Sequence, residues 1–189
     1  MSWRWIPNAI CVLRILLVAP VAVSLLRGDY TTTLLLFAVA AASDGLDGWL
    51  AQTFNWTSRL GGILDPIADK LLLVTVVVTL VARGLVPVWL AASVVLRDVV
   101  IVSGATAYHF LIGSLEGRPT IVSKLNTLLQ LSFVLLVIAA AGWPWVPRPL
   151  VIALGAATFV TTVVSGLDYV LTYARLAWVQ SHRQAARAR

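Results

Sequence analysis

The sequence has little charge and almost no cysteine. Only 12% of its 189 residues are charged, 8 are acidic, and Cys11 is the one cysteine. A single cysteine excludes an intrachain disulfide and a cysteine-rich metal site, so redox chemistry is not indicated. With 60% hydrophobic residues and a mean hydropathy of +0.92, the chain is too apolar for a soluble globule of this length. The composition therefore predicts an integral membrane protein.

Six apolar stretches approach the roughly 20 residues that a bilayer-spanning helix needs. We predict spans at residues 7–26, 31–50, 63–82, 88–112, 122–141 and 150–173. Glycine and proline in the connectors mark turns, and no room remains for a soluble domain. A cleaved signal peptide is the alternative for the first span, but Arg14 interrupts its apolar run and no convincing cleavage site precedes Asp29. We therefore expect an all-α membrane protein with six transmembrane helices in one domain over residues 1–176, followed by a basic cytoplasmic tail over residues 177–189.

Basic residues are distributed unevenly between the two sides of these spans. Lysine and arginine favour cytoplasmic loops. Eight of them fall on the side of both termini and three on the other: Arg4, Arg59, Arg118, Lys124, Arg175, Arg183, Arg187 and Arg189 against Arg27, Arg83 and Arg148. Both termini are therefore expected in the cytoplasm, in a bacterial-type inner membrane or its equivalent. The net charge of +6 fits contact with anionic lipid better than nucleic-acid binding, because the basic residues are dispersed among membrane helices.

Half of the acidic residues stand in one short stretch. Asp44 and Asp47 lie near the end of the second predicted span, and Asp65 and Asp69 lie at the start of the third. Carboxylates are costly inside a bilayer and mark functional sites. Spacings of three and four residues put each pair on one helical face, so two helices joined by a short loop could direct all four into a polar cavity that opens to the cytoplasm.

Four carboxylates in one apolar pocket need protons or cations. Their hard oxygen ligands suit Mg²⁺ or Mn²⁺, and two such ions would clamp a diphosphate during an in-line displacement. Gly48 and Ala51 keep the same face free of bulk, so a nucleotide could lie there. Close helix packing is the alternative for these small residues, and proton or ion transport is the alternative for the aspartates.

The stretch from Asp44 to Asp69 resembles the signature of the CDP-alcohol phosphotransferase family. That signature reads Asp-x2-Asp-Gly-x2-Ala-Arg-x8-Gly-x3-Asp-x3-Asp, and it is matched at Asp44, Asp47, Gly48, Ala51, Gly61, Asp65 and Asp69. The one departure is Gln52, which stands where the family has arginine and puts a cationic contact to the nucleotide in question. The resemblance implies that Asp44, Asp47 and Asp65 bind metal. It also implies that Asp69 takes the proton from the acceptor hydroxyl and contacts a metal as well.

By the same resemblance, the acceptor hydroxyl attacks the lipid-linked phosphorus of a CDP-activated lipid and CMP leaves, without a covalent enzyme intermediate. The CDP-lipid site would comprise Asn8, Arg14, Asp44, Asp47, Gly48, Ala51, Gln52 and Gly61. Asn8 could instead cap its helix, whereas Arg14, as a buried cation, needs a partner that the aspartates or a phosphate would supply. The family resemblance further implies a homodimer, for which the third and fourth spans are our expected interface.

Polar residues of the fourth and fifth spans are candidates for the acceptor site. Lys124 and Thr127 share a helical face, with Gln130 further along it. Arg97 and Arg118 are further candidates, although Arg97 could instead bridge to a neighbouring helix. The segment from residue 119 to residue 130, after Arg97, resembles the cardiolipin synthase branch of the family, whereas phosphatidylglycerophosphate synthases tend to show Gly-Lys-x-Lys-Thr-x-x-Gln there.

Ser123 and Asn126 replace the glycine and the second lysine of that pattern. Glycerol 3-phosphate approaches a dianion near neutral pH, since a phosphate monoester has a second pKa of about 6. Phosphatidylglycerol carries one negative charge and needs fewer lysines. The sequence therefore favours transfer of a phosphatidyl group from CDP-diacylglycerol to phosphatidylglycerol, with cardiolipin and CMP as products. Glycerol 3-phosphate as acceptor is the alternative within the family, and an ion or proton transporter is the alternative from another class.

Overall fold

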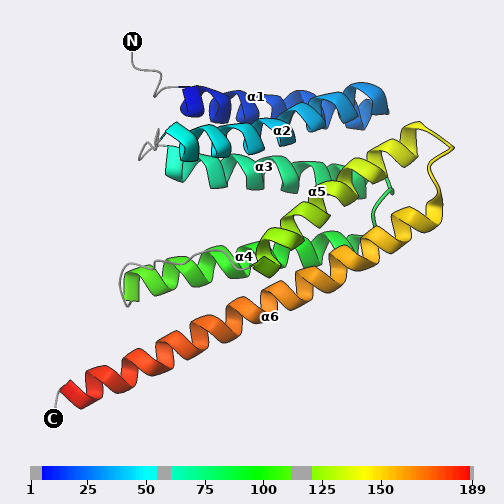
Figure 1. Cartoon of the computed structure of the whole chain (residues 1–189). Coiled ribbons are helices and arrows are strands. Elements are labelled where there is room, and N and C mark those ends of the chain that lie inside the picture. Colours follow the sequence, from blue (N-terminus) through cyan, green and yellow to red (C-terminus); the bar gives the residue numbers. More distant parts are fainter. Residues whose placement is uncertain (1–5, 55–60, 112–120, 188–189) are drawn as a thin grey trace. The chain divides into compact units, whose positions relative to one another are not determined.

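The computed structural model describes the backbone of residues 6–54, 61–111 and 121–187, and the side chains of residues 9–43, 67–104 and 121–172 (Figure 1). These backbone segments form six helices: α1 (Ile6–Arg27), α2 (Tyr30–Phe54), α3 (Gly61–Ala82), α4 (Val88–Leu111), α5 (Ile121–Gly142) and α6 (Arg148–Arg187). Each begins within two residues of a predicted span. The all-helical prediction is confirmed.

Helix α6 extends well beyond the predicted span and runs through most of the predicted tail. It has 40 residues, about 60 Å at 1.5 Å per residue, which is longer than a bilayer core of roughly 30 Å. No glycine or proline follows Gly166, and the Ala, Gln and Arg residues after Trp178 favour helix. The hydropathy of the chain falls there, but nothing in the sequence stops the helix.

Three helical segments among the described side chains are long and apolar enough to cross a membrane: Ala9–Arg27, Ile121–Gly142 and Arg148–Thr172. Large apolar side chains such as Leu16, Leu35 and Ile152 are exposed, at 66%, 63% and 71%. Charged and amide side chains such as Arg14 and Asn126 are buried instead. An apolar exterior around polar groups is the pattern of a protein in lipid, where polar residues face the protein interior. That all six helices cross the membrane stays a prediction.

The chain divides into two compact units. The first comprises residues 1–88 and 131–152, and the second comprises residues 89–130 and 153–189. Helix α5 contributes its first part to the second unit and its remainder to the first.

In the first unit, α1 packs against both α2 and α3. Cys11, Leu25, Phe37 and Val76 are fully buried in its core. Gly28 and Gly84 end α1 and α3 in the left-handed region, with φ of 78° and 69°, which glycine adopts at little cost. Each of these turns closes with a backbone hydrogen bond from the residue after the glycine to the carbonyl five residues before it, at 3.0 Å and 2.9 Å.

Arg83 ties these two helix ends together. Its Nη1 donates to the Leu26 carbonyl at 3.3 Å, and its Nη2 donates to the Tyr30 hydroxyl at 3.1 Å. Asp29 begins α2 by accepting the Thr32 backbone N–H at 3.1 Å. Hydrogen bonds from Thr32 lower the pKa of the Asp29 carboxyl below its usual range. These contacts fix the ends of α1, α2 and α3 that lie away from the aspartates.

The second unit holds α4, the beginning of α5 and most of α6. Trp89 and Phe159 join α4 to α6 in an edge-to-face contact with ring centroids 5.2 Å apart. Its interior is otherwise rich in hydroxyl and amide groups, with Asn126, Gln130, Thr158 and Ser165 all buried.

Candidate functional site

The aspartates lie on two helices that share a neighbour. Asp44 and Asp47 are in the C-terminal part of α2, and Asp65 and Asp69 are in the first turns of α3. The helical backbone puts the two residues of each pair on one face of their helix, since residues three or four apart share a face. That the four carboxylates converge stays a prediction. The side chains of the predicted site residues in this region lie outside the described ones, except for Asp69: Asp44, Asp47, Gly48, Ala51, Gln52, Gly61 and Asp65.

Asp69 forms an ion pair with Arg14 across α1 and α3. Arg14 Nη1 donates to Asp69 Oδ1. The Arg14 side chain is fully buried, whereas 39% of the Asp69 side chain is exposed. A guanidinium in an apolar helix bundle needs an anionic partner, and the sequence predicted that the aspartates or a phosphate would be that partner. The pair brings one permanent positive charge to the acidic stretch, at the helix that carries the predicted base.

The donor set of the acidic stretch fits a hard divalent cation. Four carboxylates in i, i+3 and i, i+4 pairs supply the oxygen ligands that Mg²⁺ and Mn²⁺ prefer. Among the described side chains, no group of three or more Asp, Glu, His or Cys residues gathers, and that set excludes Asp44, Asp47 and Asp65. Asp69 is the member whose side chain is described, and that side chain is partly exposed.

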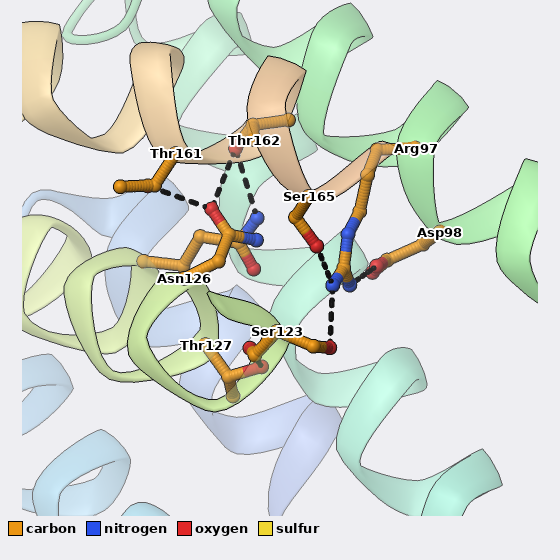
Figure 2. Close-up of polar contacts among 9 residues, drawn as sticks. Arg97, Asp98, Ser123, Asn126, Thr127, Thr161, Thr162 and Ser165 are labelled. Atoms are coloured by element: carbon orange, nitrogen blue, oxygen red, sulfur yellow. Dashed lines mark hydrogen bonds and ion pairs between the residues drawn. The ribbon is translucent and has the colours of Figure 1, made fainter. Parts of the chain in front are cut away.

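A second set of polar contacts, here named the arginine cluster, joins α4, α5 and α6 in the second unit (Figure 2). Arg97 Nη1 donates to Asp98 Oδ1 at 2.8 Å, and Nη2 donates to the hydroxyls of Ser123 and Ser165 at 2.7 Å each. The guanidinium carbon also lies 5.9 Å from the centre of the Tyr169 ring. Arg97 and Asp98 are 6% and 5% exposed. The cluster therefore bridges three helices, and the participation of Arg97 in acceptor binding stays a prediction.

Next to it on α5 and α6 lies the amide cluster, comprising Asn126, Gln130, Thr161 and Thr162. Asn126 Oδ1 accepts from the hydroxyls of Thr161 and Thr162 at 2.9 and 3.0 Å, as Figure 2 shows. Gln130 Nε2 donates to the Thr162 hydroxyl at 3.4 Å. The sequence placed Gln130 on a polar strip but did not single out the α6 partners. Their signal was the recurrence of Thr158, Thr161, Thr162 and Ser165 at helical spacing in an apolar segment.

The remaining predicted acceptor residues lie around the start of α5. Lys124 and Thr127 are both exposed, and the Thr127 hydroxyl donates to the Ser123 carbonyl at 3.2 Å. Arg118 lies outside the described residues. Asn8 is in the first turn of α1, and its side chain lies outside them too.

Comparison with known proteins identifies the family. The family model of CDP-alcohol phosphatidyltransferases matches residues 4–166. The chain belongs to this family. A probable cardiolipin synthase (CMP-forming) from Drosophila melanogaster is 32% identical over 182 residues, 88% of this chain and 56% of the relative. The human cardiolipin synthase (CMP-forming) is 30% identical over 180 residues, 87% of this chain and 60% of the relative. The chain thus spans somewhat more than half the length of these two relatives.

With a relative from another branch of the CDP-alcohol phosphatidyltransferases, the alignment covers nearly the whole length of both chains. The CDP-diacylglycerol–glycerol-3-phosphate 3-phosphatidyltransferase of Pseudomonas fluorescens is 32% identical over 182 residues, 92% of this chain and 90% of the relative. The family match contains the four aspartates, Arg14, the arginine cluster except Tyr169, and the amide cluster. The long C-terminal part of α6 lies beyond it.

Proposed function

We propose that the chain is a membrane phosphatidyltransferase that moves the phosphatidyl group of CDP-diacylglycerol to the hydroxyl of phosphatidylglycerol, giving cardiolipin and CMP. The observation that carries this proposal is the aspartate pattern, which stands at the family intervals on two helices that both pack against α1. The ion pair of Arg14 with Asp69 adds a buried cation there. Relatives named cardiolipin synthase (CMP-forming), 30–32% identical over most of the chain, support the same reaction.

In this reaction the acceptor oxygen forms a bond to the phosphatidyl phosphorus while the bond from that phosphorus to the CMP oxygen breaks. Asp69 accepts the proton of the acceptor hydroxyl. Arg14 holds the Asp69 carboxylate in place and presents positive charge to the diphosphate. Asp44, Asp47, Asp65 and Asp69 would hold two divalent cations, Mg²⁺ or Mn²⁺, which supply charge neutralisation to the diphosphate and the departing CMP.

The nucleotide contacts that we assign to this site are Asn8, Gly48, Ala51, Gln52 and Gly61. Gln52 can donate a hydrogen bond but carries no charge, where the family has arginine. Because Arg14 is buried and directed to Asp69, we infer that it supplies the positive charge that Gln52 lacks.

The choice of phosphatidylglycerol rests on the start of α5. Lys124 is exposed and supplies one positive charge to the acceptor phosphate, and we assign Thr127, Arg97 and Arg118 to the same acceptor site. Asn126 is fully buried beside the Thr161 and Thr162 hydroxyls. A lysine at this position would place a second ammonium in a neutral environment, where it would be costly without a dianionic acceptor. The neutral amide therefore favours an acceptor with one negative charge.

Glycerol 3-phosphate is the second candidate acceptor. It is favoured by the Pseudomonas fluorescens relative, with which the alignment covers 92% of this chain and 90% of the relative.

We further propose that the six helices all cross the membrane with both termini in the cytoplasm, and that two copies associate as a homodimer.

Purified protein supplied with CDP-diacylglycerol and each acceptor in turn tests this function. We expect CMP release and cardiolipin with phosphatidylglycerol in Mg²⁺ or Mn²⁺, and no release after chelation. Phosphatidylglycerophosphate as the sole lipid product would assign glycerol 3-phosphate instead. Absence of CMP release with every acceptor in detergent, where no ion gradient exists, would favour a transporter.

A further inference from the structure

A cavity of about 460 Å³ lies in the first unit, at the end that is away from the aspartates. Val137 and Ala140 of α5 and Ile152 of α6 line its sides, together with Leu85, which follows the end of α3. Of the described residues that line the cavity, Arg148 alone is charged. Its volume is within the range of roughly 300–1,000 Å³ that ligand pockets have. The cavity is therefore large enough for a ligand and lies wholly within one unit.

Helix spacing explains why space remains there. Val137, Ala140 and Ala141 stand three and four residues apart, so they share one face of α5, and two of these three side chains are small. Arg148 and Ile152 are four residues apart and share one face of α6. The cavity is therefore bounded by an apolar face of α5 and by a face of α6 that begins with a cation.

The charged and the apolar parts of the cavity lie at different depths. Arg148 is exposed and is the first residue of a segment that is long and apolar enough to cross a membrane, and Ile152 follows one turn, about 6 Å, later. Val137 lies about 7 Å before the end of α5 at Gly142. An arginine at the end of a span reaches the level of the lipid head groups. The cation therefore lies at head-group depth, and the apolar walls lie at the depth of the acyl chains.

The charges at this end of the first unit favour an anionic ligand. Among the described side chains, Arg148 has no ion-pair partner, and the first turn of α6 contains no acidic residue. Arg27 and Arg83 stand at the ends of α1 and α3, and Asp29 is the one acidic residue in this part of the sequence. Arg83 donates to a neutral carbonyl and a neutral hydroxyl. A lipid with a net negative charge would compensate these arginines, as anionic lipids do for basic residues near a membrane surface.

We propose that this cavity binds an acyl chain of an anionic phospholipid whose phosphate contacts Arg148. If the cavity were empty, the atoms that line it would lose their dispersion contacts. Water would find few polar partners among the apolar side chains. A hydrocarbon chain from the surrounding bilayer satisfies the walls, and the phosphate of the same molecule satisfies the arginine.

This lipid site is separate from the site at the aspartates. From Asp69, helix α3 continues to Ala82, about 20 Å further along its axis, and Leu85 follows after its end. The lipid in the cavity is therefore not a reactant at Asp69, and the inference does not depend on the proposed function.

Photo-crosslinking locates the bound lipid. The full chain in detergent micelles is incubated with phosphatidylmethanol that carries a diazirine on one acyl chain. This lipid has one negative charge and no hydroxyl that could act as an acceptor. Zwitterionic phosphatidylcholine with the same acyl chains is compared with it, and peptide mass spectrometry quantifies the labelled residues. We expect labelling of residues 137–152, about fivefold higher with phosphatidylmethanol at subsaturating concentration, as one basic residue near an anionic lipid provides.

Two variants separate the charge from the cavity. Arg148→Gln removes the cation, so the two labelling yields should become nearly equal. Ala140→Phe fills the cavity, so labelling by both lipids should fall. Arg27→Gln is the matched control, because it removes another exposed arginine from the same unit but not from the cavity lining. In this control the fivefold preference should remain.

The unmodified chain alone can overturn the inference. Equal labelling of residues 137–152 by the two lipids would do so, and so would the absence of label there. If label is absent and Ala140→Phe also changes the oligomeric state in native mass spectrometry, the cavity belongs to an interface between two copies instead. Labelling that persists in Ala140→Phe would show that the acyl chain contacts only the outer surface of the helices. A preference lost equally in Arg27→Gln and Arg148→Gln would show that the charge of the whole surface acts, which also contradicts a site at Arg148.

Discussion

Asp69 combines an ion pair with partial exposure of its side chain. One of its oxygens is bound by the fully buried Arg14, and yet more than a third of its side chain is exposed. A base needs both a fixed orientation and access to its substrate, since a proton is transferred only within hydrogen-bond reach. Among the four aspartates, Asp69 is the one for which the structure describes both.

Asp69→Asn tests this role. The amide keeps the size of the side chain but cannot take a proton, so CMP release should fall by about 10²- to 10⁴-fold, the usual contribution of a general base. Binding of CDP-diacylglycerol with metal, measured separately by calorimetry, should be largely retained. Near-normal turnover in this variant would refute the assignment of Asp69 as the base.

Gln52 gives a second prediction at the scale of one residue. If Arg14 supplies the charge that the family places at this position, Gln52→Arg should leave the affinity for CDP-diacylglycerol unchanged or lower it. In an Arg14→Leu background, the same substitution should recover part of a lost affinity, on the order of tenfold for one charge-assisted hydrogen bond. Binding isotherms of the four combinations measure this. A large gain of affinity from Gln52→Arg alone would show that Arg14 does not compensate.

The sequence predicted the kind of partner that Arg14 has, but not the partners of Arg97. It predicted that Arg14 needs an anionic partner, because a buried cation is costly, and the structure supplies Asp69 at 55 positions further along the chain. It did not predict that Arg97 would pair with the adjacent Asp98, because neighbours on a helix usually point apart. The serine and threonine partners on α6 were missed as well, since isolated hydroxyl residues are common in membrane helices and carry little signal.

At the scale of helices, the arginine cluster joins α4, α5 and α6 through one guanidinium. Removing one member of a buried ion pair is strongly destabilising, by about 3–5 kcal/mol, because the other charge loses its compensation. Arg97→Leu should therefore lower the free energy of unfolding by this amount, and replacing Arg97 and Asp98 together by leucine should cost less than Arg97→Leu alone. Denaturation in mixed detergent micelles, followed by circular dichroism, measures both.

Gly166→Ala is the control for this prediction. A Cβ at Gly166 would lie 3.6 Å from Arg97 Cγ, an ordinary contact, so the substitution should leave the cluster intact. Alanine also favours a helix interior over glycine by up to about 1 kcal/mol. If Gly166→Ala and Arg97→Leu destabilise equally, packing and not the ion pair explains the loss.

Helix starts were predicted well and helix ends less well. The starts of α2, α4, α5 and α6 lie within two residues after a glycine or proline, so a turn signal marks each of them. At the end of α6 no turn signal follows, and helix-forming residues continue to Arg187 after the apolar residues stop. Hydropathy therefore predicted the apolar part of α6 but not the end of the helix.

For the whole molecule, the division into two units separates the candidate residues by role. The four aspartates and Arg14 belong to the first unit, and the acceptor candidates Arg97, Lys124 and Asn126 belong to the second. In both units the buried charged and amide groups are surrounded by an exposed apolar surface. Membrane topology then decides from which side water-soluble reactants and metal ions reach these groups.

Cysteine labelling tests that topology across α5. Cys11 is buried, so a Cys11→Ala background gives a chain without reactive thiols, into which Ile121→Cys or Trp145→Cys is introduced. Both positions are exposed, at 85% and 77%, and they flank an apolar helix long enough to span a membrane. With both termini cytoplasmic, a membrane-impermeant maleimide applied to intact cells should label the cysteine at position 145 and spare the one at position 121. The reverse pattern would place the termini and the junction of α2 with α3 outside the cell, away from cytoplasmic CDP-lipid chemistry. The distribution of basic residues would then contradict the positive-inside tendency.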